Sequence, residues 1–135
     1  MIEIKLDELD WDKMGNDLIP VVTQEADTLE VLTLAYVNVE ALRLTLETGW
    51  AHYYRRSRGR VMRKGVTSGN VQRVREVLVD CDNDALVFLV EQTGPACHLG
   101  ERTCFHKHLA SVAERAVGLG QVNLPRTYKY SIGRR

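Results

Sequence analysis

Residues 71–92 read Val71-Gln-Arg-Val-Arg-Glu-Val-Leu-Val-Asp-Cys81-Asp-Asn-Asp-Ala85-Leu-Val-Phe-Leu-Val-Glu-Gln92. Two runs rich in apolar and β-branched residues, Val71–Cys81 and Ala85–Gln92, lie on either side of Asp82-Asn83-Asp84. Runs of this composition are typical of strands, and Asp and Asn are typical of the turns between them. The stretch therefore predicts a pair of strands and a β-rich fold.

Two more strand pairs are expected nearer the N-terminus. The runs 18–24 and 29–37 flank a short polar turn, and so do the runs 51–56 and 60–64. None of these pairs is followed by the regular strand–helix alternation of a doubly wound fold. The chain is therefore expected to be α+β and β-rich, with mostly antiparallel strands and one or two helices.

The first helix is expected between Asn38 and Gly49. An Asn side chain can cap a helix N-terminus, and a glycine can end a helix. Between them Val39, Leu42 and Leu46 recur at helical spacing. A second, C-terminal helix ending at Gly118 is expected from the same spacing of Leu109, Val112, Ala113, Ala116 and Val117.

The composition indicates one soluble domain spanning residues 1–135. The chain has 135 residues, 44% of them hydrophobic and 27% charged, with a formal net charge of zero. The N-terminus lacks the pattern of a signal peptide, and no apolar run approaches the ~20 residues that span a membrane. An odd number of cysteines without a secretion signal favours reduced thiols and a cytoplasmic location.

Three carboxylates, Asp80, Asp82 and Asp84, alternate along the middle of the quoted stretch. On a strand Asp80 and Asp82 would share a face, and a cation would relieve their repulsion. A turn at Asn83 could fold Asp84 back toward the same ion. The alternative is a polar, solvated turn without a metal. An EF-hand is excluded because Ala85 stands where that loop requires glycine, and the flanks are strand-like.

All three cysteines, Cys81, Cys97 and Cys104, lie within 25 residues of sequence that begins at Asp80. Three thiolates match a catalytic zinc site that keeps one position open. A histidine could serve as a base or fourth ligand, and the candidates are His52, His98, His106 and His108. The alternative is that they are free cysteines filling a core. If Cys81 points away from the carboxylates, the chain has two separate metal sites or a site completed by another subunit.

Basic residues make up six of the ten positions from Arg55 to Lys64, and the small-residue loop 65–70 follows. Guanidiniums bind phosphate in bidentate fashion, while glycines and the hydroxyls of Thr67 and Ser68 allow close contact with an anion. The lysine precedes the glycines, so the segment is not a P-loop. A solvated charged hairpin, or an RNA-binding surface with nearby tyrosines as stacking platforms, would have the same composition.

Together these segments resemble the phosphoribosyl-AMP cyclohydrolase family of histidine biosynthesis, over roughly residues 17–106. The most specific part of the resemblance is the combination of Asp-Cys-Asp, Cys-His and Cys-Phe. The residues that carry it are Leu18-Ile19-Pro20, Leu34-Ala35-Tyr36, Glu40-Ala41-Leu42, Thr48-Gly49, Ser57-Arg58, Lys64-Gly65, Thr67-Ser68-Gly69, Asp80-Cys81-Asp82, Glu91-Gln92, Ala96-Cys97-His98 and Cys104-Phe105.

The resemblance implies a hydrolase that opens the purine ring of N1-(5-phosphoribosyl)-AMP at the N1–C6 bond. It implies an intertwined homodimer with shared active sites and two cofactors, Zn²⁺ and Mg²⁺. Zinc would be bound by Cys81 of one protomer with Cys97 and Cys104 of the other. Magnesium would be bound by the carboxylate cluster Asp80, Asp82 and Asp84.

The same resemblance assigns roles in catalysis and substrate binding. Zinc would activate a water molecule, and His98 would transfer a proton. Magnesium would help to hold the phosphates of the nucleotide, together with Arg58, Lys64, Thr67, Ser68 and Gly69. No membrane or nucleic acid is then expected as a partner. The alternative is a non-catalytic, metal-stabilised module that binds a nucleotide or RNA through residues 55–64.

Six positions depart from the usual family pattern, while every expected metal ligand is retained. The departures are expected to cluster around the phosphate and base pocket, where they would alter substrate binding more than metal binding. They are Val37, Val39, Trp50, Arg55, Met62 and Val66.

Overall fold

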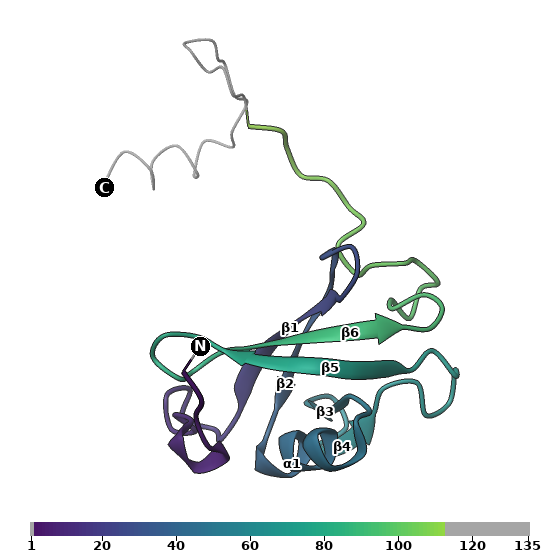
Figure 1. Cartoon of the computed structure of the whole chain (residues 1–135). Coiled ribbons are helices and arrows are strands. Elements are labelled where there is room, and N and C mark those ends of the chain that lie inside the picture. Colours follow the sequence, from purple (N-terminus) through teal and green to yellow (C-terminus); the bar gives the residue numbers. More distant parts are fainter. Residues whose placement is uncertain (1, 113–135) are drawn as a thin grey trace.

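The strand pair expected around Asp82 forms the centre and edge of a four-stranded sheet in the computed structural model, which describes residues 2–112. Figure 1 shows this sheet, with the helix and a small second sheet beside it. In chain order the elements are the 3₁₀ turn η1 (Leu6–Glu8), β1 (Ile19–Glu25), β2 (Val31–Val37), α1 (Val39–Thr48), β3 (His52–Arg55), β4 (Arg60–Arg63), β5 (Gln72–Val79) and β6 (Leu86–Gln92).

All three expected strand pairs are present. The large sheet has the order β2-β1-β6-β5, and β3 pairs with β4 in the small sheet. Sequence neighbours pair antiparallel, whereas β1 and β6 are parallel. The prediction of a β-rich α+β fold with mostly antiparallel strands is confirmed. The parallel contact follows from the long connection between β1 and β6, which contains the helix and the small sheet.

Helix α1 begins and ends as its sequence predicts. The Asn38 side chain accepts a hydrogen bond of 2.8 Å from the Ala41 amide, which satisfies one of the free N–H groups at the helix start. Gly49 adopts a left-handed conformation with φ of 83°, and its amide donates to Thr45. A left-handed glycine is a common helix terminus because it carries no Cβ.

The buried face of α1 differs from the apolar spacing that predicted the helix. Ala41, Leu42 and Thr45 are buried, whereas Val39 and Leu46 are 40% and 56% exposed. Thr45 can be buried because its hydroxyl donates to the Ala41 carbonyl and accepts from the His52 amide, which fixes the helix against β3.

The expected C-terminal helix is not found where the structure describes the chain. Residues 109–112 are irregular, and the remainder of the expected helix lies outside the described residues. The segment after Phe105 runs away from the sheet (Figure 1), and Leu109 is 97% exposed. Within residues 2–112, no helix has the length and apolarity needed to span a membrane.

The core lies between the large sheet and the elements that cover it, and it includes a buried polar chain. The Tyr53 hydroxyl hydrogen-bonds to Thr23 at 2.7 Å and to the Gln72 carboxamide oxygen at 2.6 Å. The Gln72 side-chain nitrogen donates to Gln92 at 2.8 Å. This chain links β3 to β1, β5 and β6. The largest fully buried side chains include Ile19, Val21, Leu32, Val37, Leu42, Phe88 and Val90.

The loop that follows β4 offers a matched test of backbone constraint. Gly65 and Gly69 have φ of 82° and 80°, so alanine at either position costs about 1–2 kcal/mol. A Cβ on Gly65 would also lie 2.6 Å from the Asn70 carbonyl carbon, whereas Gly69 has nothing within 4 Å. In urea unfolding, Gly65→Ala is expected to destabilise the protein by at least about 1 kcal/mol more than Gly69→Ala. Equal losses would contradict the close approach.

Candidate active site

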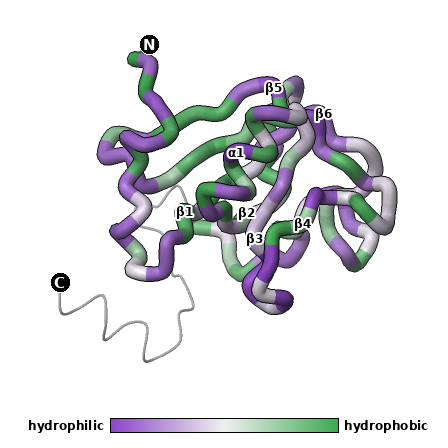
Figure 2. The backbone as a smooth tube through the Cα atoms, turned by 90° about the horizontal axis from the view of Figure 1, so that it is seen from below, coloured by the Kyte–Doolittle hydropathy of each residue, from purple (hydrophilic) through white to green (hydrophobic). Residues whose placement is uncertain are grey.

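A cavity of about 770 Å³ opens beside β2, the β3–β4 hairpin and the loops 64–70 and 95–104. The turn between β3 and β4 is mostly hydrophilic (Figure 2), and its arginines supply much of the positive charge on the cavity wall. Most of the expected thiol, substrate-binding and catalytic residues are gathered here. Those that line the cavity are Arg58, Lys64, Thr67, Ser68, Cys97, His98 and Cys104.

Two of the three cysteines are brought together by a tight loop. The Cys97 amide donates to Glu101 at 3.0 Å, and the Cys104 amide donates to Leu32 of β2 at 2.8 Å. Cys97 is 5% exposed, whereas Cys104 is exposed. Burial and the neighbouring Cys97 raise the pKa of the Cys104 thiol. Two adjacent thiols can hold a soft or borderline metal, which would stabilise their thiolate forms.

Lys64 connects the basic segment, residues 55–64, to the loop 97–104, which carries Cys97 and Cys104 and is called the thiol loop below. Its ammonium donates a hydrogen bond of 2.7 Å to the carbonyl oxygen of Ala96, the residue before Cys97. Burial lowers the pKa of Lys64, while Cys104 and Cys97 act in the opposite direction. Lys64 is therefore placed to fix the position of the thiol loop as well as to contact an anion in the cavity.

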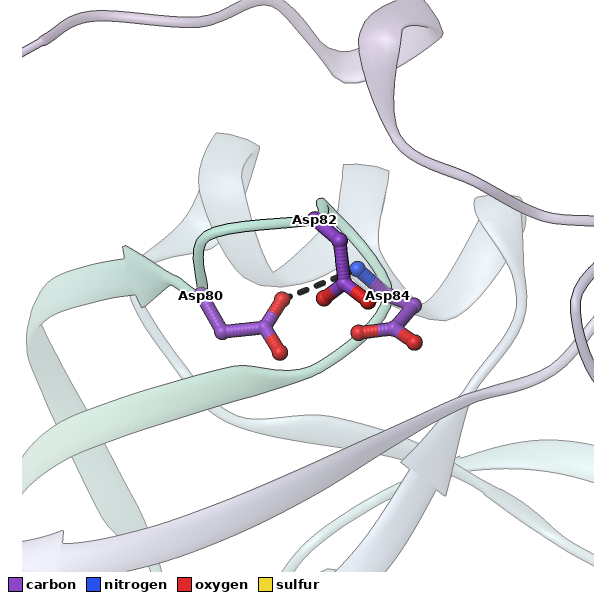
Figure 3. A group of neighbouring side chains, drawn as sticks. All are labelled: Asp80, Asp82 and Asp84. Atoms are coloured by element: carbon purple, nitrogen blue, oxygen red, sulfur yellow. Dashed lines mark hydrogen bonds between the residues drawn. The ribbon is translucent and has the colours of Figure 1, made fainter.

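The three expected carboxylates come together in a turn, and strand alternation plays no part in this. β5 ends at Val79, and Asp80 Oδ1 accepts hydrogen bonds from the amides of Asp84 and Ala85 at 3.0 and 3.1 Å. Figure 3 shows the three carboxylates turned toward one another. One oxygen from each of Asp80, Asp82 and Asp84 lies within 4.8 Å of the others. Such a set of carboxylate oxygens suits a hard cation.

Lys13, which the sequence patterns did not single out, reaches this turn from the N-terminal segment. Its ammonium lies 2.9 Å from Asp84 Oδ2 and 3.2 Å from Asp82 Oδ2. Hydrogen bonding with Asp82 and Lys13 lowers the pKa of Asp84 to about 2. Hydrogen bonding with Asp84 raises the pKa of Asp82. The Lys13 ammonium therefore neutralises part of the negative charge of this turn.

The acidic turn and Cys81 lie at the opposite end of β6 from the cavity. The seven residues of β6 span about 20 Å at the usual rise of a strand. The turn between β5 and β6 and the loop after β6 lie at opposite ends of β6 (Figure 1). Cys81 belongs to that turn, and Cys97 belongs to the loop after β6. Within the described part of one chain, Cys81 therefore does not join Cys97 and Cys104. Gly69 is likewise absent from the cavity wall, although its loop lines it.

The structure also shows contacts at the cavity that sequence patterns did not single out. The Arg56 guanidinium lies over the Tyr36 ring, 4.1 Å from its centroid, and both residues line the cavity. Tyr53 lines it too, and burial raises the pKa of its hydroxyl. Tyr36 and Arg56 each lie in a segment that the sequence did highlight, but their contact was not predicted, since they face each other only because β2 and β3 fold together.

The six departures from the family pattern are only partly gathered at the cavity. Arg55, Met62 and Val66 line it, as expected. Trp50 instead lies next to β5, where the Arg73 guanidinium is 5.5 Å from its ring centroid. The remaining two also lie away from the cavity wall. Val37 is in the core, and Val39 is at the exposed start of α1.

Residues 33–106 match the phosphoribosyl-AMP cyclohydrolase family. The chain belongs to this family. The matched range contains the β3–β4 hairpin, the small-residue loop 65–70, the acidic turn 80–84 and both cavity thiols. A phosphoribosyl-AMP cyclohydrolase of Cenarchaeum symbiosum is 54% identical over 108 residues, which cover 80% of this chain and 99% of that protein.

Two further relatives show the same similarity. A phosphoribosyl-AMP cyclohydrolase of Archaeoglobus fulgidus is 59% identical over 102 residues, which cover 76% of this chain and 93% of that protein. A histidine biosynthesis bifunctional protein of Pyrococcus furiosus is 55% identical over 108 residues, covering 80% of this chain but 51% of that protein. Membership of the cyclohydrolase family identifies this protein as an enzyme and a hydrolase.

The contact between Lys64 and Ala96 predicts that Lys64→Met loosens the thiol loop. A hydrogen bond from a charged donor contributes roughly 1.5–3 kcal/mol, so the amides of Cys97 and Gly100 should exchange their hydrogens at least about tenfold faster. Hydrogen exchange followed by mass spectrometry would measure this. Lys107→Met, at an exposed position, is the control. Unchanged exchange in the thiol loop of Lys64→Met would contradict the anchoring role.

Proposed function

We propose that this protein opens the purine ring of N1-(5-phosphoribosyl)-AMP by hydrolysing the N1–C6 bond, a step of histidine biosynthesis. The observation that carries the proposal is the family match over residues 33–106, which includes the whole wall of the cavity. The reaction is assigned to the cytoplasm, where free thiols persist.

The substrate is a nucleotide with two phosphate groups, and the charge of the cavity suits it. Arg58 and Lys64 would neutralise the phosphates, and the hydroxyls of Thr67 and Ser68 would donate to their oxygens. Gly69 would help to keep the loop small enough for close contact. The Tyr36 ring, covered on one face by Arg56, is a suitable wall for the purine.

The donors at the cavity fit zinc in part. Cys97 and Cys104 are adjacent thiols, whereas Cys81 of the same chain is a strand length away. We therefore assign the third zinc ligand to Cys81 of a second copy. When bound, zinc would supply activated water at neutral pH. His98, on the cavity wall next to Cys97, is placed to exchange a proton with the substrate.

The acidic turn fits magnesium. Its donors are carboxylate oxygens, and the Lys13 ammonium between Asp82 and Asp84 marks the position as favourable for positive charge. When bound, magnesium would neutralise phosphate charge. Because the acidic turn is remote from its own cavity, this role requires the cavity of a second copy.

A homodimer follows from these assignments. The chain exposes apolar side chains along its last described segment, with Phe105 60%, Leu109 97% and Val112 82% exposed. The edge strand β2 adds Val31 and Leu34 at 40% and 52%. Apolar surface of this kind is typical of protein–protein interfaces. We assign it to the interface between two copies of the chain.

The proposed reaction predicts metal-dependent turnover of phosphoribosyl-AMP by the purified protein. Dialysis against a chelator should abolish turnover, and adding Zn²⁺ and Mg²⁺ together should restore it, because the thiols and carboxylates bind different ions. Turnover can be followed by the change in ultraviolet absorbance when the purine ring opens. A folded, metal-replete protein without turnover would mean that Met62, Val66 and Arg55 have changed the substrate.

Shared zinc sites predict that two inactive variants restore each other. Mixed dimers of Cys81→Ser and Cys97→Ser would contain one intact site, so random reassociation should recover about a quarter of wild-type turnover. The control pair, Cys97→Ser with Cys104→Ser, would contain no intact site and should recover none. Native mass spectrometry verifies that mixed dimers form. Equal recovery in both pairs, or none in either, would contradict a zinc site built from two chains.

A further inference from the structure

Lys13 occupies the carboxylate oxygens that a metal ion would need. Its ammonium contacts Asp82 Oδ2 and Asp84 Oδ2 at 3.2 and 2.9 Å. Asp80 Oδ1 is already committed to two backbone amides within the turn. A magnesium ion binds its ligand oxygens at about 2.0–2.1 Å and needs carboxylates that face it directly. The two cations therefore compete for the same two side chains.

Simultaneous occupation is electrostatically unfavourable. A divalent ion and an ammonium held by the same two carboxylates would lie within a few ångströms of each other, where like charges repel by at least about 2 kcal/mol even in bulk water. Lys13 and Asp82 are about half exposed, so the ammonium can leave for solvent at modest cost. The divalent ion carries more charge than the ammonium, so the three carboxylates of the turn attract the divalent ion more strongly.

The N-terminal segment keeps Lys13 beside the turn by contacts that do not involve its ammonium. The Asp10 amide donates to the Asn83 carbonyl at 2.8 Å, and the Asn83 side chain donates to the Glu8 carbonyl at 3.2 Å. The Trp11 ring nitrogen donates to Leu6 and keeps this segment folded. Lys13 is thus tethered three residues beyond a fixed point, which gives it a high effective concentration at the carboxylates.

We propose that Lys13 is a tethered cation that occupies the Asp82 and Asp84 carboxylates and is displaced when a divalent cation binds there. The inference rests on the magnesium site of the proposed function. It assigns Lys13 as a residue that sets the affinity of that site, and it couples metal binding to release of the Lys13 side chain. The ammonium stabilises the acidic turn of the metal-free protein, and the divalent ion takes over this role.

The first test is Mn²⁺ binding to the full-length, zinc-loaded protein, measured from the electron paramagnetic resonance signal of free Mn²⁺. Lys13→Gln is expected to bind Mn²⁺ roughly three- to tenfold more tightly than the wild type, because exposed ion pairs are individually modest. Lys13→Arg, which keeps the charge, should stay near wild type. Lys5→Gln controls for a general change in charge, and Asp84→Asn should bind more weakly than the wild type. Urea midpoints verify that each variant is folded.

The second test measures displacement itself. Trypsin cleaves after lysine, so Mn²⁺ should accelerate cleavage after Lys13 in the wild type but leave cleavage after Lys5 unchanged. In Asp84→Asn the acceleration should be lost. Affinity that is unchanged or weaker in Lys13→Gln, no Mn²⁺ binding to any variant, or metal-insensitive cleavage after Lys13 would each overturn the inference.

Neither test depends on turnover. If Mn²⁺ releases Lys13 but the protein does not hydrolyse phosphoribosyl-AMP, the inference about Lys13 stands and the proposed function is wrong. If the protein hydrolyses phosphoribosyl-AMP but Lys13 has no effect on Mn²⁺ affinity, the proposed function stands and only the inference about Lys13 is wrong.

Discussion

The arrangement of the site depends on β6, one of the two inner strands of the large sheet. It pairs in parallel with β1 and antiparallel with β5, and Leu86, Phe88 and Val90 are buried from it. A strand held in this way can neither bend nor slip without exposing its apolar face. Its two ends therefore carry two separate groups of candidate metal ligands, the acidic turn at the start and the loop with Cys97 and Cys104 beyond the end. A single chain cannot bring these groups together.

The buried polar chain has the complementary role of fixing the cavity wall to this sheet. Tyr53 is buried against Phe88, with the two ring centroids 5.8 Å apart, while its hydroxyl joins Thr23 and Gln72. A buried hydroxyl needs hydrogen-bond partners, so β3 has one favourable position relative to β1 and β5. The basic hairpin continues directly from β3. The guanidiniums at its tip are thus mounted on the same core that supports β6.

Local signals predicted most of this fold, and contacts between distant segments account for what they missed. Asn38 and Gly49 mark the helix ends because a cap is a local hydrogen bond or a local backbone conformation. The parallel pairing of β1 with β6 depends on how the whole chain folds back, which no short pattern encodes. Strand alternation was the wrong reason for grouping Asp80 with Asp82, whereas the turn expected at Asn83 does bring Asp84 toward them. Lys13 was missed because it lies 69 residues from Asp82 in sequence and resembles any surface lysine.

The charges at the two ends of the sheet suggest how two copies of the chain would fit together. The acidic turn has three carboxylates, and the cavity at the other end is lined by Arg55, Arg58, Lys64 and other basic residues. In a twofold dimer the same contact occurs twice, so an acidic turn that approaches the partner's basic cavity does so at both sites. That approach would place the carboxylates, and any divalent ion they hold, beside the residues proposed to bind phosphate. A formal net charge of zero for the whole chain thus leaves room for a local separation of acidic and basic groups, which is the complementarity that such a dimer would use.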